Sequence, residues 1–94
     1  MPAYSVLLVI TYKRSARDPE GETLARELRV LGYSAVKEVR VGKAMIFTVE
    51  AGSERDASRL VVDLAEQTRL YNPAVHSVEV VILGEGRGGE VSGH

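Results

Sequence analysis

Apolar and polar residues alternate in four segments of the chain, and this period of two predicts β-strands. The segments cover residues 4–12, 36–41, 44–50 and 78–83. The residues that we expect to face inward from the first three strands are Tyr4, Val6, Leu8, Ile10 and Tyr12, then Val39 and Val41, then Met45, Phe47 and Val49.

A helical period follows the first predicted strand. Asp18 and Pro19 suit the cap and the first position of a helix, and Gly32 suits its end. Between them, Leu24 and Leu28, with Leu31 three residues later, form one apolar stripe that we expect to face a sheet.

A second helix is predicted after the third strand. Ser53 and Asp56 form a variant of the capping box, and apolar residues at helical spacing continue to about residue 70. Asn72 and Pro73 prevent further helical turns.

The order of these elements is β-α-β-β-α-β, which is the ferredoxin-like arrangement of the α+β class. It predicts a four-stranded antiparallel sheet with two helices on one face. A short Gly42-Lys43 hairpin would join the second strand to the third. We expect residues 1–83 to form a single domain and the glycine-rich residues 84–94 to form a flexible tail.

The first and last predicted strands are apolar on both faces. Leu7 and Val9 oppose the inward residues of the first strand, and Val81 and Leu83 do so in the last. A sheet with helices on one side only should be polar on the other, so a second copy of the chain is the simplest cover. This pattern predicts a homodimer or a dimer of dimers that associates through the sheet.

Composition excludes several classes of function. The 94 residues carry a net charge of −1, so the chain lacks the basic field that a nucleic acid requires. No cysteine is present, which excludes disulfides, thiolate metal sites and a cysteine nucleophile. The longest apolar run is too short to cross a bilayer and the N-terminus lacks signal-peptide features. These properties favour a cytoplasmic protein with no nucleic-acid or membrane partner.

Gly42-Lys43 is the most obvious candidate for phosphate binding. A P-loop requires a glycine five residues earlier and a hydroxyl residue after the lysine, but Lys37 and Ala44 occupy these positions. The pair also connects two predicted strands instead of opening a helix. We therefore interpret it as a hairpin.

The remaining candidate residues favour structural roles. Phe47 alone cannot form an RNA-stacking platform, and neither His76 nor His94 has metal-ligand spacing to another histidine. No serine lies in a G-x-S-x-G context. The acidic residues Asp18, Glu20 and Glu22 suit a helix N-terminus, and Arg55, Arg59 and Asp63 suit a solvated helix face. We expect no catalytic residue, no metal site and no cofactor in this chain.

Four short motifs nevertheless occur in a characteristic order. They are DPEG at residues 18–21, LGY at 31–33, VKEVRVGK at 36–43 and YNPAV at 71–75. With this order, spacing and chain length, residues 4–83 resemble the PurS subunit of phosphoribosylformylglycinamidine synthase.

The resemblance implies a subunit without a catalytic site of its own in a carbon–nitrogen ligase of de novo purine biosynthesis. The synthetase subunit (PurL) would use ATP and Mg, and the glutaminase subunit (PurQ) would release ammonia from glutamine. The small subunit, as a dimer, would bridge the two and support ammonia transfer between them. The resemblance also implies association through the sheets, sometimes with segments exchanged between chains.

Nine residues match the motifs and are the candidates for architecture and docking: Pro19, Gly21, Gly32, Tyr33, Arg40, Gly42, Lys43, Asn72 and Pro73. The chain departs from the family pattern at residues 13–19, where a Lys-x-Gly is usual before Asp-Pro, and at residues 74–78, which lack the usual acidic and aromatic residues. A different class of function also fits the fold, namely a regulatory module that binds a small metabolite at a dimer interface.

Overall fold

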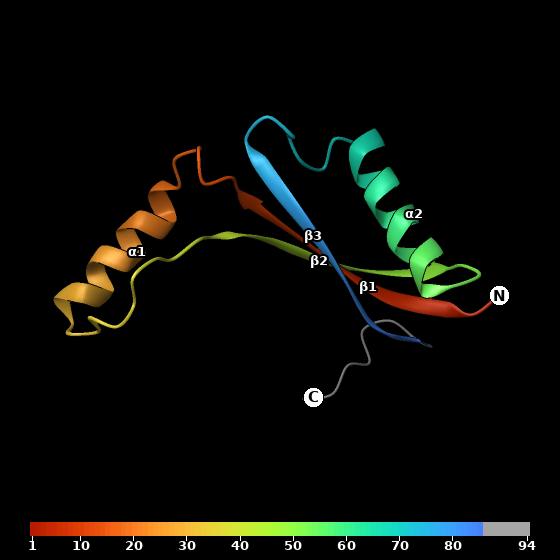
Figure 1. The fold of residues 1–94 in the computed structure, drawn as a ribbon, viewed down its shortest axis with the longest axis horizontal. Helices are drawn as coiled ribbons and strands as arrows, with labels where there is room; N and C mark the ends of the chain where they lie inside the picture. Colours follow the sequence, from red (N-terminus) through yellow and green to blue (C-terminus); the bar gives the residue numbers. More distant parts are fainter. Residues whose placement is uncertain (86–94) are drawn as a thin grey trace.

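The structure, a computed structural model of the chain, describes residues 1–85. These residues form three strands and two helices, whose arrangement is drawn in Figure 1. They are β1 (Ala3–Tyr12), α1 (Pro19–Val30), β2 (Gly42–Glu50), α2 (Glu54–Gln67) and β3 (His76–Glu85). The last strand includes Gly84 and Glu85, which we had assigned to the tail, and the rest of the predicted tail lies outside the described residues.

The three strands form one antiparallel sheet in the order β2-β1-β3. The central strand β1 pairs Leu8 with Met45 on one side and with Val80 on the other. A register shift between Ser5 and Val6 interrupts the pairing with β3. The predicted antiparallel α+β class is confirmed.

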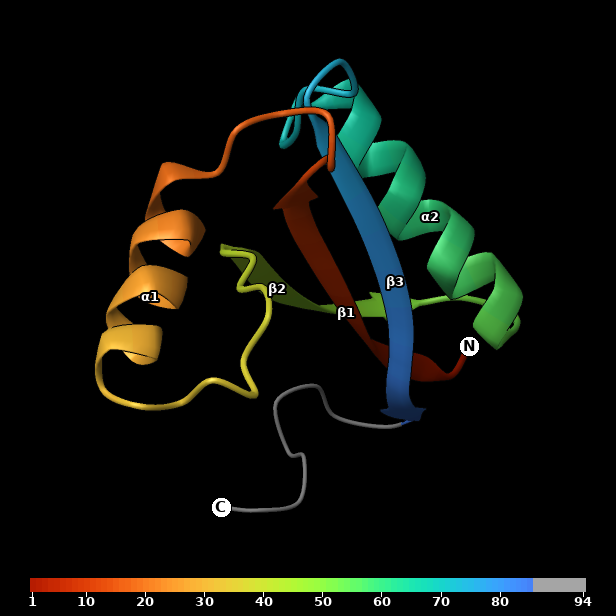
Figure 2. The same cartoon turned by 60° about the vertical axis from the view of Figure 1, so that its left-hand side comes forward.

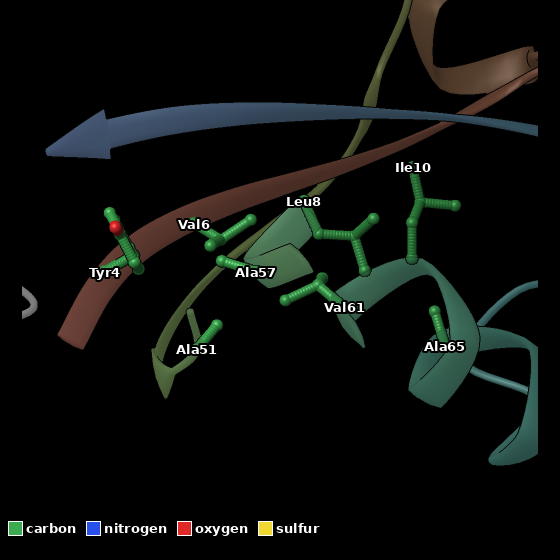
Figure 3. Close-up of a cluster of buried hydrophobic side chains, with 8 residues drawn as sticks. All are labelled: Tyr4, Val6, Leu8, Ile10, Ala51, Ala57, Val61 and Ala65. Carbon is green, nitrogen blue, oxygen red and sulfur yellow. The ribbon is translucent and has the colours of Figure 1, made fainter. Parts of the chain in front are cut away.

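The core lies between the sheet and α2 (Figure 3). Val6, Leu8 and Val61 are its largest fully buried side chains, and burial of each contributes about 1.5–3 kcal/mol to folding. The alanines of α2 let the helix lie close to the strands. The eight buried residues of this core are Tyr4, Val6, Leu8, Ile10, Ala51, Ala57, Val61 and Ala65.

Met45, Phe47 and Val49 of β2 pack against this core, as predicted. Tyr12, which we placed on the inward face of β1, is instead 36% exposed at the end of that strand.

Both helices begin where their local sequence indicates, and α1 also ends where expected. Asp18 caps α1, and Ser53 caps α2 by accepting a hydrogen bond from the Asp56 N–H. Gly32 follows α1 with a φ of 100°, where a left-handed residue closes a Schellman motif. At the end of α2, Arg69 takes that role with a φ of 56°, so α2 ends earlier than predicted.

The predicted second strand is absent from the sheet. Residues 36–41 belong to no strand, so the sheet of the described chain has three strands and not four. Gly42 and Lys43 are not a hairpin turn either, because they are the first residues of β2 and pair with Thr11 and Ile10. A side-chain carbon on Gly42 would overlap the Ile10 carbonyl oxygen, so the glycine serves close strand approach.

The position of α1 also differs from the prediction. Among the described elements, α2 packs on all three strands, whereas α1 packs on none of them. Figures 1 and 2 show α1 standing away from the sheet, joined to it by a loop on each side. The predicted stripe is consequently open, with Leu24 41% and Leu31 73% exposed. The helical pattern indicated an apolar face correctly but could not specify which surface covers it.

Candidate docking surfaces

The first candidate surface is the arm, which we define as α1 and the segment after it, residues 19–41. One carboxylate joins both ends of the arm. Asp18 Oδ1 accepts a hydrogen bond of 3.0 Å from the Gly21 N–H, and its Oδ2 accepts one of 2.9 Å from the Val41 N–H. The helix cap is thereby also a link across 23 residues of chain.

Asp18 is only 8% exposed, yet its charged form is favoured. The N–H groups of Val41 and Gly21 lower the pKa of this carboxyl below its usual value, and the charge of Arg40 adds to the effect. Burial opposes this shift without reversing it. The carboxylate therefore remains ionised and holds the two ends of the arm together at neutral pH.

Gly21 brings the two sides of the arm into contact. A side-chain carbon at this position would overlap the backbone oxygen of Val39 and would crowd the Asp18 carboxylate. Only glycine allows α1 to approach residues 39–41 this closely. Of the nine candidate residues, Pro19 and Gly21 thus build the start of the arm.

The turn after α1 connects the helix to the second half of the arm. The Tyr33 N–H donates to the Leu28 carbonyl and the Gly32 N–H donates to the Arg29 carbonyl. The Tyr33 side chain remains 58% exposed. This turn leaves a large aromatic side chain exposed in the described chain.

Arg40 lies in a groove of about 340 Å³ between α1 and residues 37–40. Its side chain is 26% exposed, and its Nη1 lies 3.6 Å from Glu38 Oε2. Gly21 lines the same groove. We call this surface the basic groove, because arginine and lysine side chains dominate its charged lining.

Lys43 lies elsewhere, in a hollow of about 540 Å³ beside the end of β1. Pro19, Gly42, Tyr12 and His76 line the same hollow. The aromatic rings of Tyr12 and His76 lie 5.0 Å apart. Lys43 and Arg40 are therefore near in sequence but line separate surfaces.

Asn72 and Pro73 form the turn before β3 and line a neighbouring hollow of about 810 Å³. The Asn72 N–H donates to His76 Nδ1, and the Asn72 carbonyl accepts from the Val75 and His76 N–H groups. His76 thus has a structural role, as we expected from its isolation. His94 lies beyond the described residues.

The second candidate surface is the open face of the sheet, opposite α2. Its centre is Leu7, which pairs with Ile46 of β2 and Val81 of β3. Ile46 is 50% and Val81 is 45% exposed, while Leu7 and Val9 are half-buried. The predicted second apolar face exists, and no part of residues 1–85 covers it.

Sequence reasoning missed the long-range role of Asp18. We identified it as a helix cap from its position before Pro19, but its bond to Val41 had no signal in the sequence, since the two residues are 23 positions apart. A capping residue uses one carboxylate oxygen, and the partner of the second depends on tertiary structure.

Residues 1–85 contain no group of three or more histidine, aspartate or glutamate side chains that could hold a metal ion. Among the described helices, none is long and apolar enough to cross a membrane. The fold and its surfaces define a small antiparallel α+β protein with an unpartnered helical arm and an uncovered apolar sheet face.

Comparison with known proteins identifies the family. Residues 5–84 match the family model PurS, described as phosphoribosylformylglycinamidine (FGAM) synthase. The FGAM synthase subunit PurS of Thermotoga maritima is 36% identical over 80 residues, which are 85% of this chain and 96% of that protein. The chain therefore belongs to the PurS family, a subunit of FGAM synthase.

Solved structures share the same fold. A chain in the structure of PurLQS from Thermotoga maritima superposes with a TM-score of 0.76 and 36% identity, covering 88% of this chain and 100% of that one. The crystal structure of Methanocaldococcus jannaschii PurS has a TM-score of 0.70 and 29% identity, covering 84% and 94%. The chain as a whole therefore shares its fold with solved structures of PurS proteins.

Proposed function

We propose that this chain is the non-catalytic subunit of an FGAM synthase complex in the cytoplasm. It would bridge a synthetase and a glutaminase subunit and support ammonia transfer between them. The observation that carries the proposal is the family match over residues 5–84. The PurLQS structure, which contains a similar chain, supports an assembly of this kind.

In this assembly the chain contributes surfaces and not reacting groups. ATP and Mg would bind in the synthetase subunit, and this chain would bind neither. The arm and the open sheet face are two separate surfaces that the described chain leaves uncovered. A bridging subunit requires at least two such surfaces, because it must contact more than one partner.

We further propose that the open sheet face pairs with a second copy of this chain. Exposed apolar side chains such as Ile46 and Val81 favour burial, and a two-fold axis would place each face against its identical counterpart. The stripe of Leu24 and Leu31 would gain a cover in the same assembly or against the larger subunits.

Reconstitution tests the function. The synthetase and glutaminase subunits of the same organism are assayed for glutamine-dependent formation of formylglycinamidine ribonucleotide with and without this chain. We expect turnover to require the chain, and we expect the chain alone to have no activity. Activity with ammonium salts in place of glutamine should be far less dependent on it, because free ammonia bypasses transfer between subunits.

Two results would contradict the proposal. One is glutamine-dependent turnover that is unchanged when the chain is omitted. The other is activity of the isolated chain on any of the complex's substrates.

A further inference from the structure

The basic groove carries a net positive charge, whereas the chain as a whole is net negative. Its cations come from both sides of the arm and from the loop before it: Arg14, Arg26, Arg29, Lys37 and Arg40. Three carboxylates line it as well, Asp18, Glu22 and Glu38. Five positive charges against three negative ones give a net charge of +2, on a chain whose total is −1.

Within residues 1–85, none of these five side chains donates a hydrogen bond to a carboxylate. Arg14 and Arg40 approach Glu38 only at 3.5 and 3.6 Å, and neither contact is a hydrogen bond. Arg26 bonds the neutral hydroxyl of Thr23. An incoming carboxylate would therefore find free donors.

The other two cations are similar. Lys37 donates to the backbone carbonyl of Ser34, and Arg29 has no ion pair among the described residues. Cations near the end of α1 also interact well with the helix dipole, which accounts for Arg29 in part. It does not account for Lys37 and Arg40, which lie on the opposite side of the groove.

The two sides of the groove are held at a fixed separation. The Asp18 carboxylate bonds the N–H groups of Gly21 and Val41, and Gly21 allows contact with the Val39 backbone. The cations therefore project from a preorganised frame, which lowers the entropy cost of binding.

We propose that the basic groove docks a carboxylate-rich segment of a partner subunit. The inference rests on the proposed function and specifies one of its contacts. A protein segment fits better than a nucleic acid, because the three carboxylates within the groove and the net negative charge of the chain repel a continuous phosphate backbone. The mixed charges of the groove suit an acidic segment that also carries basic residues.

The test is a charge reversal on α1. Arg26 and Arg29 are both exposed, so Arg26→Glu with Arg29→Glu alters the groove without disturbing the core. The matched control is Arg55→Glu with Arg59→Glu, because these residues are exposed on α2 and lie outside the groove. Affinity of each purified variant for the mixed synthetase and glutaminase subunits is measured by biolayer interferometry at low and high salt.

We expect the groove variant to bind about ten-fold more weakly or worse at low salt, and the control to stay within about two-fold of the wild type. The difference should shrink as salt screens the charges. Arg26→Lys with Arg29→Lys should recover most of the affinity, because it keeps the charge. Circular dichroism and sedimentation establish that each variant retains its fold and oligomeric state. If the Arg26→Glu with Arg29→Glu variant does not, Arg26→Gln with Arg29→Gln takes its place, since it removes the two positive charges without adding negative ones.

The outcomes separate the inference from the proposed function. If the wild type binds its partners and the groove variants bind equally well, the groove inference is wrong and the proposed function stands. Equal weakening by the α2 control would also overturn it. Phosphate binding that depends on Arg26 and Arg29, with assembly unaffected, would assign the groove to a different ligand. Failure of the wild type to bind either subunit would overturn the proposed function itself.

Discussion

At the scale of single residues, the Asp18 side chain links two backbone segments that are far apart in the sequence. Its two carboxylate oxygens satisfy one N–H at the start of α1 and one just before β2. Without this link, α1 would be attached to the sheet only by its flanking loops, since it packs on no strand. A single side chain therefore joins the start of a helix to a segment 23 residues away.

Replacing this carboxylate should loosen the arm. In Asp18→Asn one carboxylate oxygen becomes an NH₂ group, which cannot accept from an N–H, so one of the two bonds is lost. We expect a lower midpoint of chemical denaturation at neutral pH. Asp63→Asn on the exposed face of α2 is the control and should leave that midpoint unchanged.

The same carboxylate predicts a pH dependence. Because folding lowers the pKa of Asp18 below its ordinary value of 3.8, its contribution is complete above about pH 3.8 and disappears as the pH falls through the lower folded-state pKa. Denaturation curves recorded from neutral pH into acid should converge for the wild type and Asp18→Asn. A constant difference between them across that range would contradict the role of the carboxylate charge.

Gly42 offers a second test at this scale. A methyl group there would overlap the Ile10 carbonyl, so Gly42→Ala should force β1 and β2 apart and cost about 1–3 kcal/mol in the free energy of unfolding. Gly84→Ala is a matched control, because a methyl group on that strand glycine meets no atom of residues 1–85 within 4 Å. Urea denaturation should separate the two variants; equal stabilities would show that β2 moves freely to make room.

At the scale of elements, short sequence patterns correctly predicted features that depend on neighbouring residues, such as helix caps and strand faces. The caps Asp18 and Ser53 and the stop at Gly32 lie where the sequence placed them, because each depends on neighbouring residues. The faces of β1 and β2 followed from their alternation in the same way.

Pairing and docking were predicted less well. Residues 36–41 alternate like a strand but belong to none, because alternation does not determine whether a partner strand is available. Likewise, the stripe of Leu24 and Leu31 predicted an apolar face on α1 but not that this face would be left open. The basic groove was not foreseen, because it joins residues from both sides of the arm.

The detachment of α1 predicts its dynamics. The folded arm is held by the Asp18 and Gly21 contacts, but α1 packs on no strand. Such a helix opens locally at lower free energy than a central strand, so the amides of α1 should exchange hydrogen much faster than those of β1, which is paired on both sides. Hydrogen-exchange mass spectrometry on dilute protein measures this directly. In the reconstituted complex, α1 should become protected while β1 changes little. Equal protection of α1 and β1 in the dilute chain would contradict the described arrangement.

At the scale of the whole molecule, the uncovered surfaces lie on different parts of the fold. The open sheet face belongs to the strands, and the basic groove belongs to the arm. One is apolar and the other is charged. Apolar faces favour permanent association, whereas charged grooves favour orientation and specificity. This separation suits a subunit that pairs with itself through the sheet and contacts larger partners through the arm.

The pairing of the sheet leads to a prediction for self-association. Ile46→Asp places a charge in the centre of the open face, beside Leu7, where burial against a second copy would leave it unpaired. Because Ile46 is 50% exposed in the single chain, the fold itself should survive, as circular dichroism would verify. Sedimentation should detect a species near the chain mass of 10.2 kDa for the variant and about twice that mass or more for the wild type.

Leu60→Asp on α2, where Leu60 is 42% exposed, is the control and should sediment like the wild type. If Ile46→Asp keeps the mass of the wild type, self-association uses another surface, with the arm as the remaining apolar candidate.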